Sequence, residues 1–193
     1  MNESCKRLVV GITGASGVVY GLETVRALKE LGYESHVVLS DAAITNFALE
    51  TEYAAEDVER AAGRLHGNRD LAAPIASGSF TTLGMAVIPC TIKTLSAIAN
   101  SYCENLLVRA ADVTLKERRT LVLVVRETPL HKGHLELMLK AASLGAVILP
   151  PVPAFYHKPE TIRDLVLHTV GKTLDCFHIP HDLYRRWVGA GTP

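Results

Sequence analysis

The chain has 193 residues, of which 48% are hydrophobic, and this is enough apolar material for one well-filled core. Lys and Arg (20) balance Asp and Glu (20), so no global field attracts nucleic acid or an anionic membrane. No apolar run approaches the about 20 residues that a membrane-spanning helix needs. We therefore expect a soluble protein with no nucleic-acid and no membrane partner.

Strand-like and helix-like segments alternate along the chain. The strand-like runs are nearly continuous in apolar residues, as strands buried on both faces are, and cover 8–12, 35–39, 85–89, 121–125 and 146–149. The helix-like runs cover 18–31, 41–49, 54–62, 92–100, 105–118, 132–144 and 161–177. This alternation predicts an α/β fold in three layers, with a doubly wound parallel sheet between helices. We expect one domain over 1–177 and a polar C-terminal arm over 178–193.

The cysteines and the amino terminus predict a reducing compartment. The four cysteines include no C-x-x-C pair and stand at Cys5, Cys90, Cys103 and Cys176. The amino terminus lacks the apolar core of a signal peptide. We expect a reduced protein located in the cytoplasm.

The segment RLVVGITGASG (7–17) is the strongest functional signal in the chain. A β-branched apolar strand runs into a glycine-rich turn, and a helix is predicted from Val18. A strand, a glycine turn and a helix start in this order present free peptide N–H groups to an anion, most often a phosphate. The turn therefore predicts binding of a phosphorylated cofactor.

Three further strands also end in polar residues. In an open parallel sheet, ligands bind beyond the carboxyl ends of the strands. Ser40 follows the second predicted strand, PCTIKT (89–94) the third, and Arg126 and Glu127 the fourth. Together they predict one site for a ligand with a phosphate and a polar ring edge. Taken singly, the same residues could be N-caps (Ser40, Thr91), a solvated side chain (Lys93) and a surface ion pair (Arg126 and Glu127).

A charged stripe is predicted on the helix over 105–118. Arg109, Asp112 and Lys116 are spaced by three and four residues, so they share one helix face. The stripe could be a solvent-facing ladder of ion pairs, which is the commoner outcome. Alternatively, Arg109 and Lys116 could reach a second phosphate.

Seven motifs resemble one known family in their order and spacing. They are GITGASG (11–17), LET (49–51), SGSF (77–80), IPCTIKTL (88–95), RAADVTLKERR (109–119), RETPLHKGHL (126–135) and PPVPAFYHKP (150–159). Over 8–177 the chain resembles the flavin prenyltransferases, the family of UbiX and of the B component of phenolic acid decarboxylase. The arm with Arg185, Arg186 and Trp187 is similar to that of the phenolic acid decarboxylase branch.

The resemblance implies a fold, an activity and an assembly. It implies a flavodoxin-like (Rossmann-like) domain in a homo-oligomer, a dodecamer built from trimers. The implied enzyme joins a dimethylallyl group from dimethylallyl phosphate to reduced FMN. Its product, prenylated FMN, would pass to a partner apo-decarboxylase that acts on aromatic acids.

The resemblance also implies site residues. Those for FMN are Gly14, Ala15, Ser16, Ser40, Thr91, Ile92, Lys93, Thr94 and Arg109. Those for the prenyl phosphate, gathered from more than one copy of the chain, are Lys116, Arg126, Glu127, Tyr156 and Lys172. Relatives often have serine at position 91 and arginine at position 172. Lysine keeps the charge of arginine but loses its bidentate fork.

The implied chemistry is consistent with these residue types. Ser16 and Glu50 are implied as the proton-handling pair, and Lys116, Arg126 and Glu127 complete the expected catalytic set. The cations would stabilise the leaving phosphate, and the aromatic faces of Phe80, Tyr156 and Trp187 would shield the allyl cation from water. Fixed cations would replace Mg²⁺, so no metal is expected. His131 and His134 lack a third ligand and are interpreted as helix-start residues.

Two other functions remain open from the sequence. The turn T-G-x-x-G also occurs in NAD(P)-binding reductases, with Asp41 as a candidate ribose ligand, but no tyrosine has a lysine four residues on. Alternatively, the chain could be a flavin-binding accessory or scaffold subunit of a decarboxylase complex. A second phosphate site at Lys116, Arg126 and Lys172 would distinguish the enzyme, because a flavin carrier does not need one.

Overall fold

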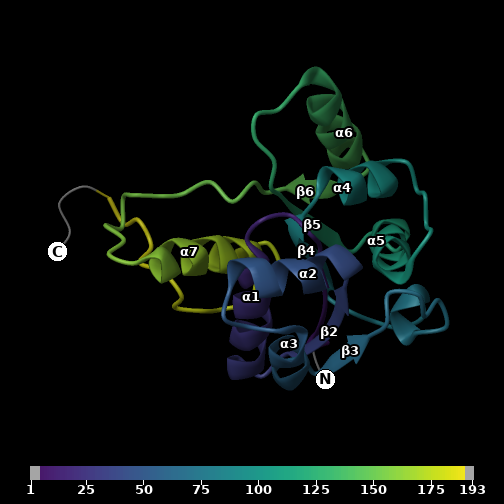
Figure 1. Ribbon diagram of the computed structural model, residues 1–193, viewed down its shortest axis with the longest axis horizontal. Helices are drawn as coiled ribbons and strands as arrows, with labels where there is room; N and C mark the ends of the chain where they lie inside the picture. Colours follow the sequence, from purple (N-terminus) through teal and green to yellow (C-terminus); the bar gives the residue numbers. More distant parts are fainter. Residues whose placement is uncertain (1–4, 190–193) are drawn as a thin grey trace.

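A single parallel sheet forms the centre of the computed structural model, which describes residues 5–189 (Figure 1). Its strand order is β3-β2-β1-β4-β5-β6. The strands are β1 (Arg7–Ile12), β2 (Glu34–Leu39), β3 (Arg64–His66), β4 (Gly84–Cys90), β5 (Thr120–Val125) and β6 (Ala146–Ile148). The helices are α1 (Val18–Glu30), α2 (Asp41–Glu50), α3 (Ala55–Ala61), α4 (Ile92–Ala99), α5 (Leu106–Lys116), α6 (Lys132–Ser143) and α7 (Ile162–Asp175), with a 3-10 turn, η1, at Pro74–Ala76.

Two separate cores lie on the two faces of the sheet. Successive side chains of a strand point to opposite faces, so Leu8 and Val10 of β1 join one core and Val9 joins the other. The first core contains apolar residues of α1, α2, α3 and α7, and the second those of α4, α5 and α6. This arrangement confirms the expected three-layer α/β fold.

The strand order has one reversal, between β1 and β4. The five strands expected from the sequence are β1, β2, β4, β5 and β6, and counted by themselves they follow the flavodoxin-like order 2-1-3-4-5. Chain connections leave β1 and β4 towards opposite sides of the sheet, so a crevice opens between their carboxyl ends. The fold therefore directs attention to the residues after Ile12 and Cys90.

Thr13 joins the two strands at this point. Its hydroxyl donates to the carbonyl of Pro89 (2.8 Å) and accepts from the N–H of Thr91 (2.9 Å). The Thr13 side chain is buried, and its peptide N–H also reaches the Pro89 carbonyl (3.2 Å). Thr13 therefore fixes the ends of β1 and β4 to each other at the bottom of the crevice.

The short edge strand β3 was not predicted. It has three residues, pairs with β2 from Arg64 to His66, and buries only the last of them. So short a segment carries no apolar run. No helix in residues 5–189 is long and apolar enough to cross a membrane.

After α7 the chain turns back and runs alongside that helix, as the yellow segment of Figure 1 shows. His181 contacts the Gly171 carbonyl (Nε2 to O, 2.9 Å), and further along the ring of Tyr184 packs on His168 (4.8 Å between centroids). This accounts for residues 178–189 of the expected arm. Residues 190–193 of that arm lie outside the described residues.

Candidate functional site

The glycine turn after β1 packs directly against the start of α2. A Cβ at Gly14 would lie 2.3 Å from the Cβ of Ala42, so only glycine fits there. Asn46 of α2 donates its side-chain amide to the Gly14 carbonyl (3.0 Å). Gly17, the N-cap of α1, has φ +99°, a left-handed conformation that favours glycine. The turn is therefore fixed between two helices.

A cavity of about 540 Å³ opens on one side of this turn. We call it the helix-end cavity, because its lining includes the beginnings of α2, α4 and α5. The lining residues are Thr13, Gly14, Ser40, Asp41, Ala42, Asn68, Arg69, Thr91, Lys93, Thr94, Glu104 and Asn105. A helix N-terminus carries partial positive charge, so three of them favour an anion.

The hydroxyls of Ser40 and Thr91 act as helix caps as well as lining this cavity. Ser40 Oγ accepts from the N–H of Ala43 (3.1 Å), and Thr91 Oγ1 accepts from the N–H of Thr94 (3.1 Å). The simpler N-cap interpretation is thus confirmed. Peptide N–H groups in the first turn of a helix have no partner inside it, so the N–H groups of Ile92 and Lys93 remain able to donate to a ligand.

The helix-end cavity is lined by side chains of both positive and negative charge. Lys93 Nζ lies 3.8 Å from Glu104, and the lysine side chain is 87% exposed. Arg69 adds a second cation and Asp41 a second anion. These exposed charges nearly cancel, so the helix ends supply the fixed preference for an anion.

A second cavity, of about 740 Å³, lies on the other side of the turn. We call it the proline-lined cavity, because the segment Pro150–Pro153 forms one wall. Ser16, Arg126 and Glu127 line it, together with Gly17, Val19, Tyr20, Val125, Thr128, Leu130, Ile162 and Val166. The peptide N–H of Arg126 is held by the Cys90 carbonyl (3.1 Å). A glycine turn between a polar and a largely apolar cavity suits a ligand that has both kinds of surface.

Tyr20 and Arg126 both line the proline-lined cavity. Burial raises the pKa of the Tyr20 hydroxyl, and the Arg126 guanidinium lowers it by a smaller amount. The phenol is therefore neutral at physiological pH and can donate a hydrogen bond.

Glu50 reaches the glycine turn from the end of α2. Its Oε2 accepts from the peptide N–H of Gly17 at 2.7 Å. The carboxylate is thus bound to the residue that follows Ser16, at the N-terminus of α1, where a negative charge is stabilised. The structure brings together the two residues expected to handle protons.

The remaining expected site residues lie outside both cavities. Arg109 donates to the Ala76 carbonyl (3.2 Å) and pairs with Asp112 (3.2 Å). Lys116, at the end of α5, pairs with Glu117 next to Gly78. Lys116 precedes β5 and Arg126 follows it, so the six residues of β5, about 20 Å long, separate the two cations within one chain.

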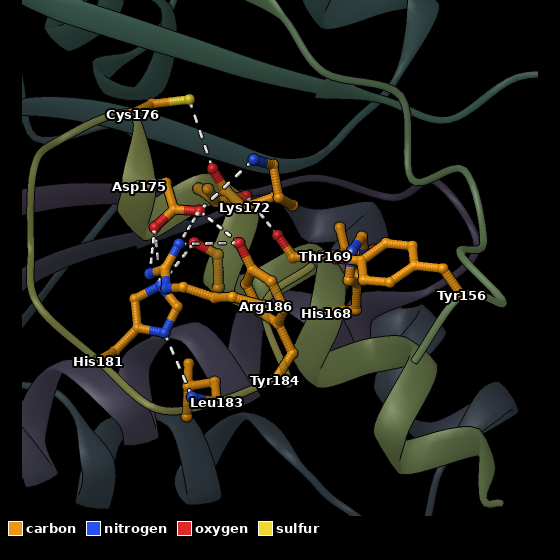
Figure 2. A network of polar contacts seen from close by, with 12 residues as sticks. Tyr156, His168, Thr169, Lys172, Asp175, Cys176, His181, Leu183, Tyr184 and Arg186 are labelled. Carbon is orange, nitrogen blue, oxygen red and sulfur yellow. Dashed lines mark hydrogen bonds and ion pairs between the residues drawn. The ribbon is translucent and has the colours of Figure 1, made fainter. Parts of the chain in front are cut away.

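Tyr156, Lys172 and Trp187 form a third group, from the loop before α7, from α7 itself and from the arm, and Figure 2 labels the first two of them. Tyr156 Oη lies 3.2 Å from His168 Nε2, and its ring is 6.0 Å from that of Trp187. Lys172 lies 3.5 Å from Asp175. Within one chain the expected prenyl-phosphate residues therefore lie in three separate places.

The histidines and acids of the described chain supply no evident metal centre. Within residues 5–189, no three His, Cys, Asp or Glu side chains are grouped so as to hold a metal ion. His131 is the N-cap of α6, where its Nδ1 accepts from Gly133 (3.0 Å). The interpretation of this histidine as a helix-start residue is confirmed.

Several cavity residues were not singled out from the sequence. Asn68 and Arg69 come from an irregular loop, where no periodic pattern marks them. Tyr20 lies inside a helix, where its pattern is that of a core residue. The only signal for Tyr20 is its position in the first turn of the helix that follows the glycine turn, because that turn lies on the ligand-binding edge of an open parallel sheet.

Comparison with known proteins places the chain in a family. The family model described as Flavoprotein matches residues 1–173. The flavin prenyltransferase UbiX of Escherichia coli K12 is 55% identical over 188 residues, which cover 96% of this chain and 100% of that protein. The chain belongs to the flavin prenyltransferase family. The glycine turn is therefore explained by membership of this family, and not by the alternative of an NAD(P)-binding reductase.

Two solved structures of the family share the fold closely. AnUbiX (PadA1), in complex with FMN and dimethylallyl pyrophosphate, has a TM-score of 0.94 and 47% identity, covering 95% of this chain and 98% of that one. A dodecameric FMN-dependent UbiX-like decarboxylase of Escherichia coli O157:H7 has a TM-score of 0.92 and 49% identity, covering 95% of this chain and 100% of that one. The sheet and helices described above are thus those of the family.

Proposed function

We propose that this chain transfers a dimethylallyl group from dimethylallyl phosphate to reduced FMN. The observation that carries the proposal is the pair of cavities on either side of one glycine turn, one bounded by three helix N-termini and the other by prolines and apolar side chains. FMN has a phosphate for the first kind of surface and a planar ring for the second. Family membership and the FMN-bound relative support the same assignment.

FMN fits the residues present. Its phosphate would be held by the first-turn N–H groups of α4 and by the hydroxyls of Ser40, Thr91 and Thr94, with Gly14 and Ala15 allowing close approach. The resemblance assigns Lys93 and Arg109 to FMN as well, and within this chain each is paired with an acid, Glu104 and Asp112 respectively. When bound, reduced FMN supplies the electron-rich ring to which the prenyl group is joined.

The prenyl donor would lie in the proline-lined cavity. Arg126 would contact its phosphate and Glu127 would line the pocket beside it, and Lys116, Tyr156, Lys172 and Trp187 would be contributed by neighbouring copies. Cations at fixed positions stabilise a leaving phosphate as it gains charge. The apolar wall at Pro150–Pro153 would exclude water from the allyl fragment.

Ser16 and Glu50 would move protons at the flavin. The Glu50 carboxylate is already oriented by the Gly17 N–H, so a proton acceptor is fixed at the turn. A carboxylate held in place in this way can act as a general base.

The assembly would be a homo-oligomer, a dodecamer built from trimers. A dodecameric relative supports this assignment. Leu135 and Leu139, one turn apart on α6, are 53% and 69% exposed, and such a stripe suits contact with another copy. The product would go to an apo-decarboxylase for aromatic acids, in the cytoplasm. The four cysteines are free thiols, as in a reducing compartment.

Binding and product analysis test this proposal. Calorimetry should give tight binding of FMN and much weaker binding of NADPH. Mass spectrometry should detect prenylated flavin after incubation with reduced FMN and dimethylallyl phosphate, and a parallel sample with the pyrophosphate distinguishes the two donors. Tight NADPH binding without FMN binding would overturn the assignment, and FMN binding without prenylated flavin would favour the scaffold function.

A second experiment separates this chain from its partner. Decarboxylation needs an electron sink, and the modified flavin is the group that supplies it. The isolated protein with FMN and a phenolic acid should release no CO₂. The filtrate of its prenylation reaction should activate an apo-decarboxylase after the protein has been removed, and CO₂ release by the protein alone would contradict the proposal.

A further inference from the structure

Asp175, the last residue of α7, is surrounded by side chains of the arm (Figure 2). Tyr184 Oη donates to its Oδ2 at 2.6 Å. Arg186 contacts both carboxylate oxygens, at 2.8 Å (Nη2 to Oδ1) and 3.3 Å (Nη1 to Oδ2). His181 Nε2 lies 3.2 Å from Oδ1. Three residues of the arm therefore converge on one carboxylate.

These contacts occupy the hydrogen-bond acceptor positions of the Asp175 carboxylate. An ionised carboxyl group offers about four lone-pair sites, and Tyr184, His181 and the two nitrogens of Arg186 occupy that number. Lys172 Nζ lies at 3.5 Å from Oδ2, further than any of the arm's donors. Its side chain is 49% exposed. Lys172 is thus beside Asp175 without being tightly bound to it.

The cluster carries a net positive charge. The peptide N–H of Leu183 donates to Nδ1 of His181 (3.2 Å), so that nitrogen has no proton and Nε2 is the donor to the Gly171 carbonyl. One negative charge on Asp175 faces the two positive charges of Lys172 and Arg186, which leaves one in excess.

The charge state of Asp175 agrees with this count. Burial raises the pKa of its carboxyl, but the hydrogen bonds from Arg186 and Tyr184 outweigh burial and hold the pKa well below its usual range. The carboxylate is ionised at neutral pH. Without Arg186, its closest available cation would be Lys172.

The arm also contacts His168, the residue that lies against Tyr156. Tyr156 Oη meets His168, and the ring of His168 packs on Tyr184, which holds Asp175. His168 precedes Lys172 by one turn of α7, so both share a helix face. Tyr156 and Lys172, both assigned to the prenyl phosphate, are thus connected through contacts with Tyr184 of the arm.

We propose that Arg186 is a positioning residue, which occupies Asp175 so that the charge of Lys172 remains available to the phosphate of the prenyl donor. This inference rests on the proposed function, because only there is Lys172 assigned to that phosphate. Arg186 and Asp175 act through Lys172 and do not contact the donor. Removing Arg186 lets Asp175 draw Lys172 into a close ion pair, which neutralises it.

Steady-state kinetics of three variants test the inference. Arg186→Gln should raise KM for dimethylallyl phosphate by about tenfold, as expected for a weakened charge-assisted contact. The double variant Arg186→Gln/Asp175→Asn should bring KM back to within about threefold of wild type, because no carboxylate then competes for Lys172. FMN affinity should stay the same throughout. Arg185→Gln is the matched control, since it removes the same charge from the adjacent position.

The outcomes separate this inference from the proposed function. If the wild-type protein forms no prenylated flavin, the proposed function fails. If it does, an unchanged KM for Arg186→Gln, or a double variant no better than the single one, overturns the inference, since a merely structural pair would not be rescued. Should Arg186→Gln fail to fold, Asp175→Asn alone decides. Its KM should equal or fall below the wild-type value, and a raised KM would contradict the inference.

Discussion

Glu50 holds the glycine turn in place, in addition to its proposed role in moving protons at the flavin. Its carboxylate accepts from Gly17 and sits at the start of α1, which has no side-chain cap of its own. A substitution that removes the side chain would therefore disturb the turn together with any proton transfer. Only an isosteric change separates the two roles, because glutamine keeps an oxygen acceptor but loses the negative charge.

Glu50→Gln should slow prenyl transfer by a factor of about 10² to 10⁴, the range for a lost proton-transfer group. FMN affinity should change little, because the amide oxygen can still accept from Gly17. Single-turnover formation of prenylated flavin measures the rate, and calorimetry measures the affinity. Glu59→Gln, on the exposed face of α3, is the control. A full rate in Glu50→Gln would show that the carboxylate is only a structural group.

A buried histidine pair joins β2 to β3. His36 Nδ1 lies 3.0 Å from His66 Nε2, and His36 Nε2 lies 3.1 Å from Glu34. Burial lowers the pKa of both imidazoles, and the nearby arginines Arg7 and Arg64 add to this effect on His36, which Glu34 opposes. The folded protein therefore favours the neutral pair.

The stability of the protein should depend on this pair below neutral pH. Because the folded pKa values lie below the unfolded value of about 6.5, their contribution is complete above that value and is lost as pH falls through it towards the folded values. The melting temperature should fall between about pH 7.5 and pH 5.5, and less so in His66→Gln, which keeps a nitrogen facing His36 but cannot titrate. His178→Gln, at an exposed position, should behave as wild type. Equal slopes for His66→Gln and wild type would contradict the assignment.

At the scale of elements, the arm and α7 are held together at one glycine. A Cβ at Gly171 would lie 2.5 Å from the Tyr184 ring and 2.7 Å from that of His181. The helix backbone approaches the arm there because no side chain intervenes. The packing of this one position therefore decides whether the arm lies along the helix.

Gly171→Ala should displace the arm and leave the sheet intact. Trypsin cleavage at Arg185 and Arg186 should accelerate by about tenfold or more, since exposed segments are cut from their open state. FMN binding should persist, because both cavities lie outside the arm. Gly67→Ala is the control, as its Cβ would meet nothing within 4 Å. Unchanged cleavage in Gly171→Ala would show that the arm tolerates the added methyl group.

The long elements could be predicted because each has a continuous or periodic apolar pattern. All seven helices and five of the six strands in the described chain start and end within about two residues of the expected bounds. The strand β3 could not be predicted, because Arg64–His66 is too short to show an apolar run or an alternating pattern and forms by pairing with β2. Its existence is a tertiary effect.

The rim of the site was predictable for a related reason. Strand ends are visible in a sequence, and parallel strands end on one edge, so Ser16, Ser40 and Thr91 could be expected near one another. The contact between Glu50 and Gly17 needed the family resemblance, because α2 brings together residues far apart in the chain. In the proposed site, Lys116 and Lys172 come from other copies, and such a placement follows neither from periodicity nor from a single chain.

At the scale of the whole molecule, one protomer holds only part of the proposed phosphate site. The length of β5 keeps Lys116 away from Arg126. If neighbouring copies supply the missing cation, two inactive variants should complement each other. This outcome cannot occur if both cations belong to the same chain.

Assemblies formed from Lys116→Ala and Arg126→Ala chains test the shared site. Each variant alone should be inactive in prenyl transfer, with FMN affinity within about a few-fold of wild type, since neither residue lines the helix-end cavity. Mixed assemblies should recover about a quarter of wild-type activity, because a random pairing places both intact residues at one interface in that share of sites. Co-expression with a tag on each variant isolates the mixture. An inactive mixture would contradict a shared site.

The two edges of the sheet have a consequence for how copies can meet. Both edge strands, β3 and β6, are only three residues long, and β3 begins with an exposed arginine. Short, charged edges offer too few unpaired peptide groups to recruit a further strand. Growth of the sheet from one molecule into the next, the route to fibrils, is therefore blocked at both ends. Association must use helix and loop surfaces, where side-chain shape limits the number of copies and the assembly can close.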